Sequence, residues 1–210
     1  MFLSDIDIEK AINKKEIVLS PFIQSRLQPA SYDITLGNKF IENDASSTHF
    51  VDPARKIFAK TTEKLVPDEE EFVLHPGVSV LGLSKEFFGS EHYLIQVGGK
   101  SSLARVGLMI HNTAGIINPG HFLNITFEIT NQSNIPIILR PGMEIAQITF
   151  SKLSSPTKRS YDQVGRFAKD NWDHFVTKTG HEKALDVAGG KTKPRTSHEK
   201  ALATAKRTKK

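Results

Sequence analysis

Short apolar runs separated by glycine and proline dominate this sequence between residues 31 and 150. The runs are rich in β-branched and aromatic residues, and they recur at nearly regular intervals, which is typical of antiparallel strands. Many short strands with few helices predict a mainly β fold, a sandwich or barrel of the jelly-roll type. The expected strands are Ser31–Leu36, Glu71–Leu74, Val78–Leu83, Tyr93–Val97, Leu123–Thr130, Ile135–Leu139 and Glu144–Phe150.

Two connections between these runs are Pro-Gly pairs, at Pro76-Gly77 and Pro141-Gly142. Proline presets the first central position of a turn, and glycine accepts the positive φ of the second. We therefore expect a tight hairpin at each pair.

One short helix is expected before the strands, from Asp5 to about Lys15. Ser4 suits its N-cap, because a serine oxygen accepts a hydrogen bond from a free N–H of the first turn. The apolar side chains on one face of this helix are Ile8, Ala11 and Ile12.

The positive charge of the chain is concentrated at its end. Residues 178–210 contain ten Lys and Arg against three Asp and Glu, a net charge of +7, whereas residues 1–177 contain 18 against 20, a net charge of −2. The basic end has almost no large apolar residues, so burial cannot offset its ordering entropy. We expect a folded domain over residues 1–177 and a disordered basic tail over residues 178–210.

The tail has two interpretations. A basic run without aromatic residues attracts phosphates but offers no surface on which a base can stack. The tail is thus expected either to be solvated without a specific role or to make a weak contact with nucleic acid.

The chain contains no cysteine. This excludes disulfides, thiolate catalysis and a Cys-ligated zinc, and is consistent with a reducing compartment. No apolar run is long enough to cross a membrane. We expect a soluble, cytoplasmic protein with no membrane contact.

Glu128 lies in the expected strand LNITFEIT. The alternation predicts one core face and one polar face. Glu128 should point away from the core, either as a solvated side chain, which is usual for a lone glutamate, or as a functional carboxylate. The core face has Leu123, Ile125, Phe127 and Ile129, and the polar face has Asn124, Thr126, Glu128 and Thr130.

Residues 99–105 read GKSSLAR. A triphosphate carries about four negative charges, so its site needs cations, hydroxyls and backbone N–H groups close together. Glycine lets the backbone approach closely. The spacing is not that of a Walker A loop, and a surface turn with a solvated lysine is the alternative. The cations and hydroxyls come from Lys100, Ser101, Ser102 and Arg105.

Four segments together resemble the dCTP deaminase family of the dCTP deaminase and dUTPase superfamily. The resemblance covers roughly residues 1–170. It implies a distorted jelly roll of the dUTPase-like type, a homotrimer, and active sites shared between subunits. The segments are LSDIDIEKAI (3–12), QPASYDITLGNKF (28–40), GKSSLARVGLMIHNTAGIINPG (99–120) with ITFEITN (125–131), and LRPGMEIAQITF (139–150).

The resemblance implies that the chain deaminates dCTP to dUTP and ammonia, with Mg²⁺ bound through the triphosphate. Zinc deaminases use Cys ligands, which this chain lacks, so a carboxylate has to move the protons. The resemblance assigns this acid/base role to Glu128. It assigns the holding of the attacking water to Ser101, Arg105 and the backbone carbonyl of Ala114.

The same resemblance implies the nucleotide contacts, with Thr126 and Phe127 beside the base and no metal ligand among the side chains. The predicted nucleotide-binding residues are Lys100, Ser101, Ser102, Leu103, Ala104, Arg105, Asn118, Thr126, Phe127, Glu128, Tyr161 and Lys169. Two histidines lie nearby. His111 is interpreted as a packed or hydrogen-bonded structural residue, and His121 receives no role.

Departures from the family pattern leave the product open. Asn118 stands where the family has an aspartate, and an amide cannot act as a base, which weighs against dUTPase chemistry. Residues 113–115 (TAG) instead resemble the bifunctional enzymes that form dUMP. In the segment that closes over the nucleotide, Tyr161 and Lys169 match, but Asp173 replaces a glutamine. The alternatives are therefore a bifunctional deaminase and dUTP diphosphatase, a dUTPase, and a catalytically weak nucleotide-binding regulator.

Overall fold

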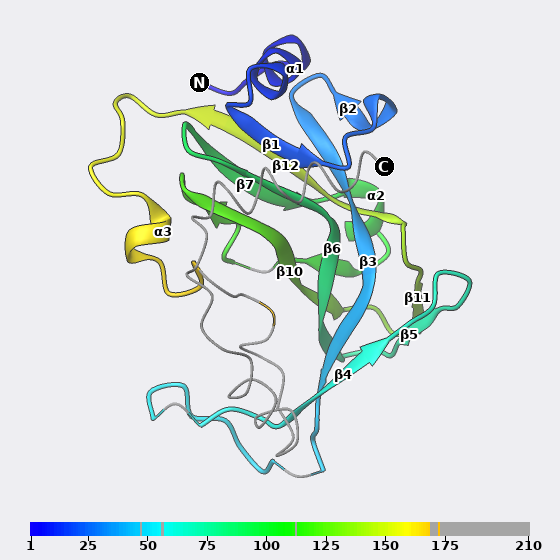
Figure 1. Ribbon diagram of the computed structural model, residues 1–210. Coiled ribbons are helices and arrows are strands. Elements are labelled where there is room, and N and C mark those ends of the chain that lie inside the picture. Colours follow the sequence, from blue (N-terminus) through cyan, green and yellow to red (C-terminus); the bar gives the residue numbers. More distant parts are fainter. Residues whose placement is uncertain (47, 56, 112, 169–171, 173–210) are drawn as a thin grey trace.

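Antiparallel strands curl around one apolar core in the computed structural model, which describes residues 1–46, 48–55, 57–111, 113–168 and 172 (Figure 1). The helices are α1 (Asp5–Asn13), the 3-10 helix η1 (Gln24–Arg26), α2 (Ser101–Ala104) and α3 (Tyr161–Val164). The strands are β1 (Ile17–Ser20), β2 (Leu27–Gln28), β3 (Ser31–Asn43), β4 (Thr61–Leu65), β5 (Phe72–Leu74), β6 (Ser79–Ser90), β7 (Tyr93–Gly99), β8 (Leu108–Ile110), β9 (Ile116–Ile117), β10 (His121–Asn131), β11 (Ile137–Leu139) and β12 (Glu144–Lys152).

The larger sheet has ten strands and the central order β8-β10-β6-β3-β12-β7-β9. β1 pairs with β6, and β2 and β4 pair with β3, while β5 and β11 form a separate two-stranded sheet. The pairing register of β10 with β6 shifts between Asn124 and Thr126, and the pairing register of β3 with β6 shifts between Leu36 and Phe40. Such irregularities bend a strand and increase its twist, so the sheet curls. The predicted mainly β architecture is confirmed.

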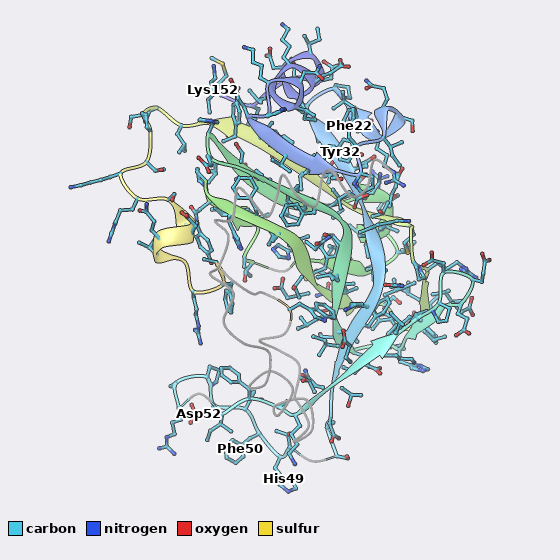
Figure 2. All side chains as sticks on the ribbon, viewed as in Figure 1. Phe22, Tyr32, His49, Phe50, Asp52 and Lys152 are labelled. Carbon is cyan, nitrogen blue, oxygen red and sulfur yellow. The ribbon has the colours of Figure 1, made fainter. Side chains whose placement is uncertain are left out.

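The core joins the two sheets through aromatic side chains. Phe40 of β3 stacks on Phe72 of β5 with ring centroids 4.5 Å apart, and both rings are almost completely buried. Near β1, Phe22 stacks on Tyr32 at 5.4 Å (Figure 2). At the opposite end, the connection from β3 to β4 extends away from the sheets and leaves Phe50 exposed (Figures 1 and 2).

The two Pro-Gly turns form, but the predicted hairpins do not. Gly77 and Gly142 have φ values of 74° and 82°. Hydrogen bonds from Val78 N–H to the His75 carbonyl and from Met143 N–H to the Arg140 carbonyl close the turns. These features match type II turns. The flanking strands do not pair with each other, because β5 pairs with β11 whereas β6 and β12 belong to the larger sheet. Each turn therefore carries the chain from one sheet to the other.

The predicted helix is confirmed with its cap. The Ser4 hydroxyl accepts a hydrogen bond from Asp7 N–H, and Ile8 and Ala11 are buried. Among the described residues no helix is long and apolar enough to span a membrane. The predicted tail over residues 178–210 and the predicted site residue Lys169 lie outside the described residues.

Candidate active site

Glu128 leaves the core as the alternation predicts. Its side chain is 41% exposed, while the neighbouring Phe127 and Ile129 are completely buried. Pairing on both sides fixes this position, because Glu128 lies opposite Leu81 of β6 and its carbonyl accepts a hydrogen bond from the backbone N–H of His111. The strand therefore presents a carboxylate on a rigid backbone.

Thr126 departs from the predicted alternation. It is 8% exposed, although it belongs to the face expected to be polar. The faces themselves do not change, because Leu123, Ile125, Phe127 and Ile129 are all buried. Thr126 is therefore covered on the polar face.

His111 contacts the carboxylate of Glu128. Its Nδ1 atom lies 2.9 Å from Oε2 of Glu128, and its own side chain is only 6% exposed. Among the described residues neither of these two atoms has a hydrogen-bond partner of good geometry, although both atoms are buried. The contact is thus close enough for an ion pair but poorly aligned for a hydrogen bond. The interpretation of His111 as hydrogen-bonded holds, but its partners belong to the predicted catalytic group.

The other ring nitrogen of His111 determines the tautomer. Nε2 lies 3.1 Å from the carbonyl oxygen of Ala114. A carbonyl only accepts hydrogen bonds, so Nε2 has to carry a proton. The same carbonyl also accepts the backbone N–H of Ile116 at 2.9 Å. Both lone pairs of the Ala114 oxygen are therefore used, and in this single chain His111 links the carbonyl to Glu128.

The GKSSLAR segment lies at a separate pocket of about 730 Å³. β7 ends at this segment, and its last residues pair with β12, so the start of α2 faces residues from β3 and β12. The predicted site residues that line this pocket are Lys100, Ser101, Ser102 and Ala104, and its other charged residues are Asp33 and Glu144.

Lys100 is held by two carboxylates. Its Nζ lies 2.7 Å from Oδ2 of Asp33 and 2.7 Å from Oε2 of Glu144. Partial burial acts to lower the pKa of Lys100, but the hydrogen bonds and charges of Asp33 and Glu144 outweigh it and raise the pKa. Asp33 also accepts a hydrogen bond from the amide of Gln28. Neither Asp33 nor Glu144 had been predicted as a site residue. Asp33 could have been found, because an aspartate among apolar strand residues is rarely buried unless it has a charged partner.

The remaining predicted residues lie outside that pocket lining. Arg105 and Asn118 are exposed, and Leu103 is half-buried. Phe127 is completely buried, so within one chain it is not open to a ligand. Within the described residues no group of three or more His, Cys, Asp or Glu side chains is placed to hold a metal ion.

The model of the dCTP deaminase-like family matches residues 2–153. This range includes Lys100, Glu128 and every strand described above. The chain belongs to the dCTP deaminase family.

Two relatives within this family show the range of named activities. A "dCTP deaminase, dUMP-forming" of Corynebacterium jeikeium is 44% identical over 163 residues, which are 77% of this chain and 86% of the relative. A "dCTP deaminase" of Halorubrum lacusprofundi is 40% identical over 166 residues, 77% of this chain and 82% of the relative. The first name specifies dUMP as the product, whereas the second specifies no product.

A solved structure supports the fold of this dCTP deaminase family member. The 2'-deoxycytidine 5'-triphosphate deaminase of Agrobacterium tumefaciens superposes with a TM-score of 0.55 and 21% sequence identity over 72% of this chain. The match spans 48% of that protein, so the chain covers about half of its length. The likeness supports the mainly β fold predicted from the sequence.

The segment after β12 packs against the start of β10 in this family member. Tyr161 of α3 stacks on His121 with ring centroids 4.1 Å apart, and Tyr161 N–H donates to the Pro119 carbonyl. Gly120 makes the approach possible, because a Cβ there would lie 2.8 Å from the Ser160 Cβ. His121 thus acquires a structural role that the sequence analysis did not assign.

This packing is expected to weaken at low pH. Burial lowers the pKa of His121 to about 4, although a hydrogen bond with the Phe167 backbone acts to raise it. The folded-state pKa is below the unfolded value of about 6.5. The contribution of neutral His121 to the free energy of unfolding is therefore complete above about pH 6.5, and it decreases by up to about 3 kcal/mol as the pH falls to about 4. Hydrogen exchange of residues 160–168 should be faster at pH 5 than at pH 7, after correction for the intrinsic exchange rate.

The matched control is His121→Phe, which keeps a ring against Tyr161 but removes the ionisation. Its corrected exchange rates should not change between the two pH values. An equal pH response in this variant and in the wild type would contradict the role of His121.

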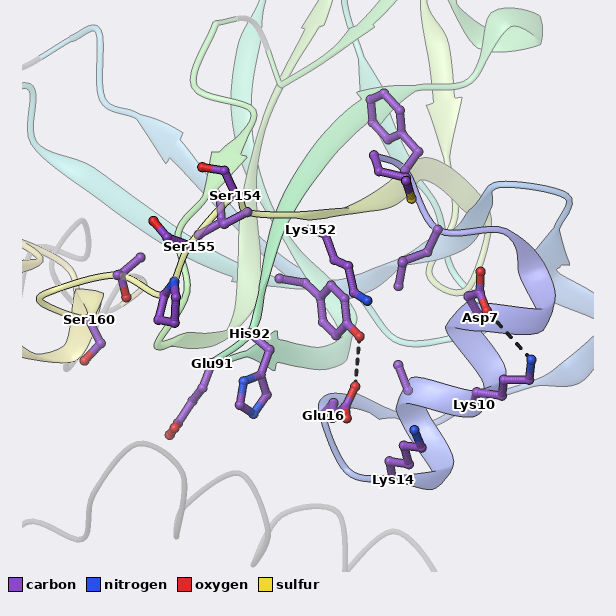
Figure 3. A pocket seen from close by; sticks show the side chains of 18 of the residues that line it. Asp7, Lys10, Lys14, Glu16, Glu91, His92, Lys152, Ser154, Ser155 and Ser160 are labelled. Carbon is purple, nitrogen blue, oxygen red and sulfur yellow. Dashed lines mark hydrogen bonds and ion pairs between the residues drawn. The ribbon is translucent and has the colours of Figure 1, made fainter.

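A larger cavity of about 840 Å³ lies between α1 and the segment that follows β12 (Figure 3). Its wall contains the hydrogen bond from the Tyr93 hydroxyl to Glu16, 2.8 Å long, and the pKa of Tyr93 is raised to about 12 by burial and by Glu16. None of the predicted site residues lines this cavity. The larger cavity and the predicted site residues therefore lie in different places.

Proposed function

We propose that the chain catalyses hydrolytic deamination of dCTP to dUTP and ammonia, without a metal at the reacting carbon. The observation that carries this proposal is the position of the Glu128 carboxylate. In this member of the dCTP deaminase family it points away from the core and contacts the buried imidazole of His111. A carboxylate that can take up and return a proton is what a deaminase without zinc requires.

The proposed reaction uses Glu128 twice. Water attacks C4 of the cytosine while Glu128 accepts a proton from the water and passes it to N3. The tetrahedral intermediate then transfers its hydroxyl proton, through Glu128, to the exocyclic amine. Ammonia leaves and the C4 carbonyl of dUTP forms, so the sum is dCTP plus water giving dUTP plus ammonia. Ser101 and Arg105 are proposed to orient the water.

Lys100, Ser101 and Ser102 are proposed to bind the phosphates. Their pocket offers a cation and two hydroxyls, which are groups that bind phosphates. A phosphate would compete with Asp33 and Glu144 for Lys100. Mg²⁺ would be bound through the triphosphate and would neutralise part of its charge. The carboxylates of Asp33 and Glu144 line the same pocket, and their oxygen chemistry suits the waters around such an ion.

A homotrimer with shared sites is part of the proposal. The pocket that contains Lys100 is not lined by Glu128 or His111, so the two predicted halves of the site do not meet in one described pocket of a single chain. A nucleotide with its base at Glu128 of one subunit and its phosphates at Lys100 of another would use both halves. We also propose that the enzyme works in the cytoplasm, where precursors for DNA synthesis are used.

Formation of dUMP is a second candidate function. Gly115 belongs to the TAG sequence that resembles the bifunctional enzymes, and a Cβ at this position would lie 2.7 Å from the Val97 carbonyl oxygen. The close approach of β7 therefore favours glycine here. The name of the Corynebacterium jeikeium relative agrees with this candidate.

Separate measurement of two products tests the proposal. The protein is incubated with Mg-dCTP and, in parallel, with Mg-dUTP, and ammonia and pyrophosphate are measured independently. Ammonia from dCTP without pyrophosphate is expected. Equal amounts of both products would establish the bifunctional reaction, and pyrophosphate from dUTP alone would establish a dUTPase. Tight dCTP binding without either product would overturn the enzymatic proposal and favour a nucleotide-binding regulator.

A further inference from the structure

We propose that His111 is a positioning residue for the reaction, and this inference rests on the proposed function of Glu128. Its imidazole is fixed by the Ala114 carbonyl, lies 2.9 Å from Oε2 of Glu128, and thereby sets where the carboxylate meets the attacking water. The sequence alone had indicated only a structural role for this histidine.

The backbone fixes His111 before its side chain makes any contact. His111 has φ = 57°, in the left-handed region that most residues avoid but that Asn, Asp and His tolerate better. Its N–H donates to the carbonyl of Glu128, 2.8 Å away. Backbone and side chain of His111 are therefore both held against the same residue, and the imidazole has little freedom to turn away.

The proton inventory of the contact follows from the two ring nitrogens. Nε2 donates to the Ala114 carbonyl, so it is protonated. The lone pair of an unprotonated Nδ1 would repel a carboxylate oxygen at 2.9 Å. The short contact is therefore favourable only if one of the two groups carries a proton, although the present alignment is too poor for a hydrogen bond between the two atoms.

Burial makes this contact chemically useful. Nδ1 of His111 and Oε2 of Glu128 are both buried and, within the described chain, lack an aligned hydrogen-bond partner. A buried polar atom without a partner is costly, so the arrangement favours a ligand or water that completes it. The geometry points to a site in which Glu128 exchanges a proton with the substrate while His111 keeps the carboxylate in place.

Two amide variants separate the contacts of His111. His111→Asn retains a polar atom near Nδ1 and tolerates the left-handed backbone, but it does not reach the Ala114 carbonyl. His111→Gln extends toward that carbonyl but loses the ring atom that faces Glu128. Each variant is expected to lower kcat for ammonia release by about tenfold to a hundredfold, with little change in KM, because misplaced catalytic groups slow the chemical step.

The matched control for kinetics is His75→Asn, since His75 is exposed and belongs to neither site. This control should keep the wild-type kcat. Circular dichroism and thermal melting establish that the His111 variants are folded. A kcat of His111→Asn within twofold of the wild type would overturn the inference.

A nuclear magnetic resonance experiment on ¹⁵N-histidine protein tests the contact without relying on activity. The Nδ1 resonance of His111 is expected to shift in Glu128→Gln, whereas the Nε2 resonance keeps the signature of a protonated nitrogen. Glu69→Gln, a change at an exposed position, should leave both resonances unchanged. An Nδ1 resonance insensitive to Glu128→Gln would overturn the inference. Failure of the proposed function is distinguishable, because it would appear as wild-type protein that releases no ammonia.

Discussion

Glu128→Gln is expected to lower the rate of ammonia release from dCTP by about a thousandfold, because general acid/base catalysis by a positioned side chain contributes about 10² to 10⁴. Glutamine keeps the size and the hydrogen-bonding shape of glutamate, but it cannot accept and return a proton. Binding of Mg-dCTP, measured by calorimetry, should stay within a few-fold of the wild type.

Two companion variants make this result specific. Glu128→Asp keeps the carboxylate but withdraws it from His111, so an intermediate rate is expected. Glu69→Gln removes an exposed carboxylate and should leave the rate unchanged. If Glu128→Gln released ammonia at the wild-type rate, Glu128 would not be the acid/base group and the deaminase mechanism proposed for this chain would be wrong.

Features set by neighbouring residues were predictable from the sequence. The direction of Glu128 follows from a period of two along one strand, and the side chain does leave the core. The two Pro-Gly turns follow from the conformational preferences of two residues. The partner of each flanking strand does not follow from such preferences, because β5 pairs with the distant β11. For this reason the turns were correct and the hairpins were wrong.

The electrostatic partners within the candidate site depend on contacts between distant segments. Lys100 was predicted to face phosphates, but its link to Asp33 exists only because β12 pairs with both β3 and β7. The contact between His111 and Glu128 likewise depends on the pairing of β8 with β10. The sequence patterns thus predicted Lys100 and Glu128 as site residues, but their partners became apparent only from the pairing of the strands.

Glu86 is a buried carboxylate that connects β6 with β3, outside both halves of the candidate site. It is 0% exposed. It accepts hydrogen bonds from Arg26 Nη1 at 2.8 Å, from Thr35 N–H at 2.8 Å and from the Thr35 hydroxyl at 2.7 Å. Thr35 follows Asp33 by two residues on β3, so the same strand that holds Lys100 is fixed to β6 through Glu86. A buried carboxylate of this kind is stable only when all its hydrogen-bond and ion-pair partners are present.

Glu86→Ala is therefore expected to lower the free energy of unfolding by about 3 to 5 kcal/mol, the usual cost of removing one partner of a buried ion pair. Urea unfolding followed by the fluorescence of Trp172, the single tryptophan and a buried one, measures this loss at equal protein concentrations. Glu86→Gln should lose less, because an amide still accepts from Thr35 N–H. Exposed Glu69→Ala should change stability by less than about 0.5 kcal/mol. A loss below about 1 kcal/mol in Glu86→Ala would contradict the role of this carboxylate, since Arg26 and Thr35 would then not depend on it.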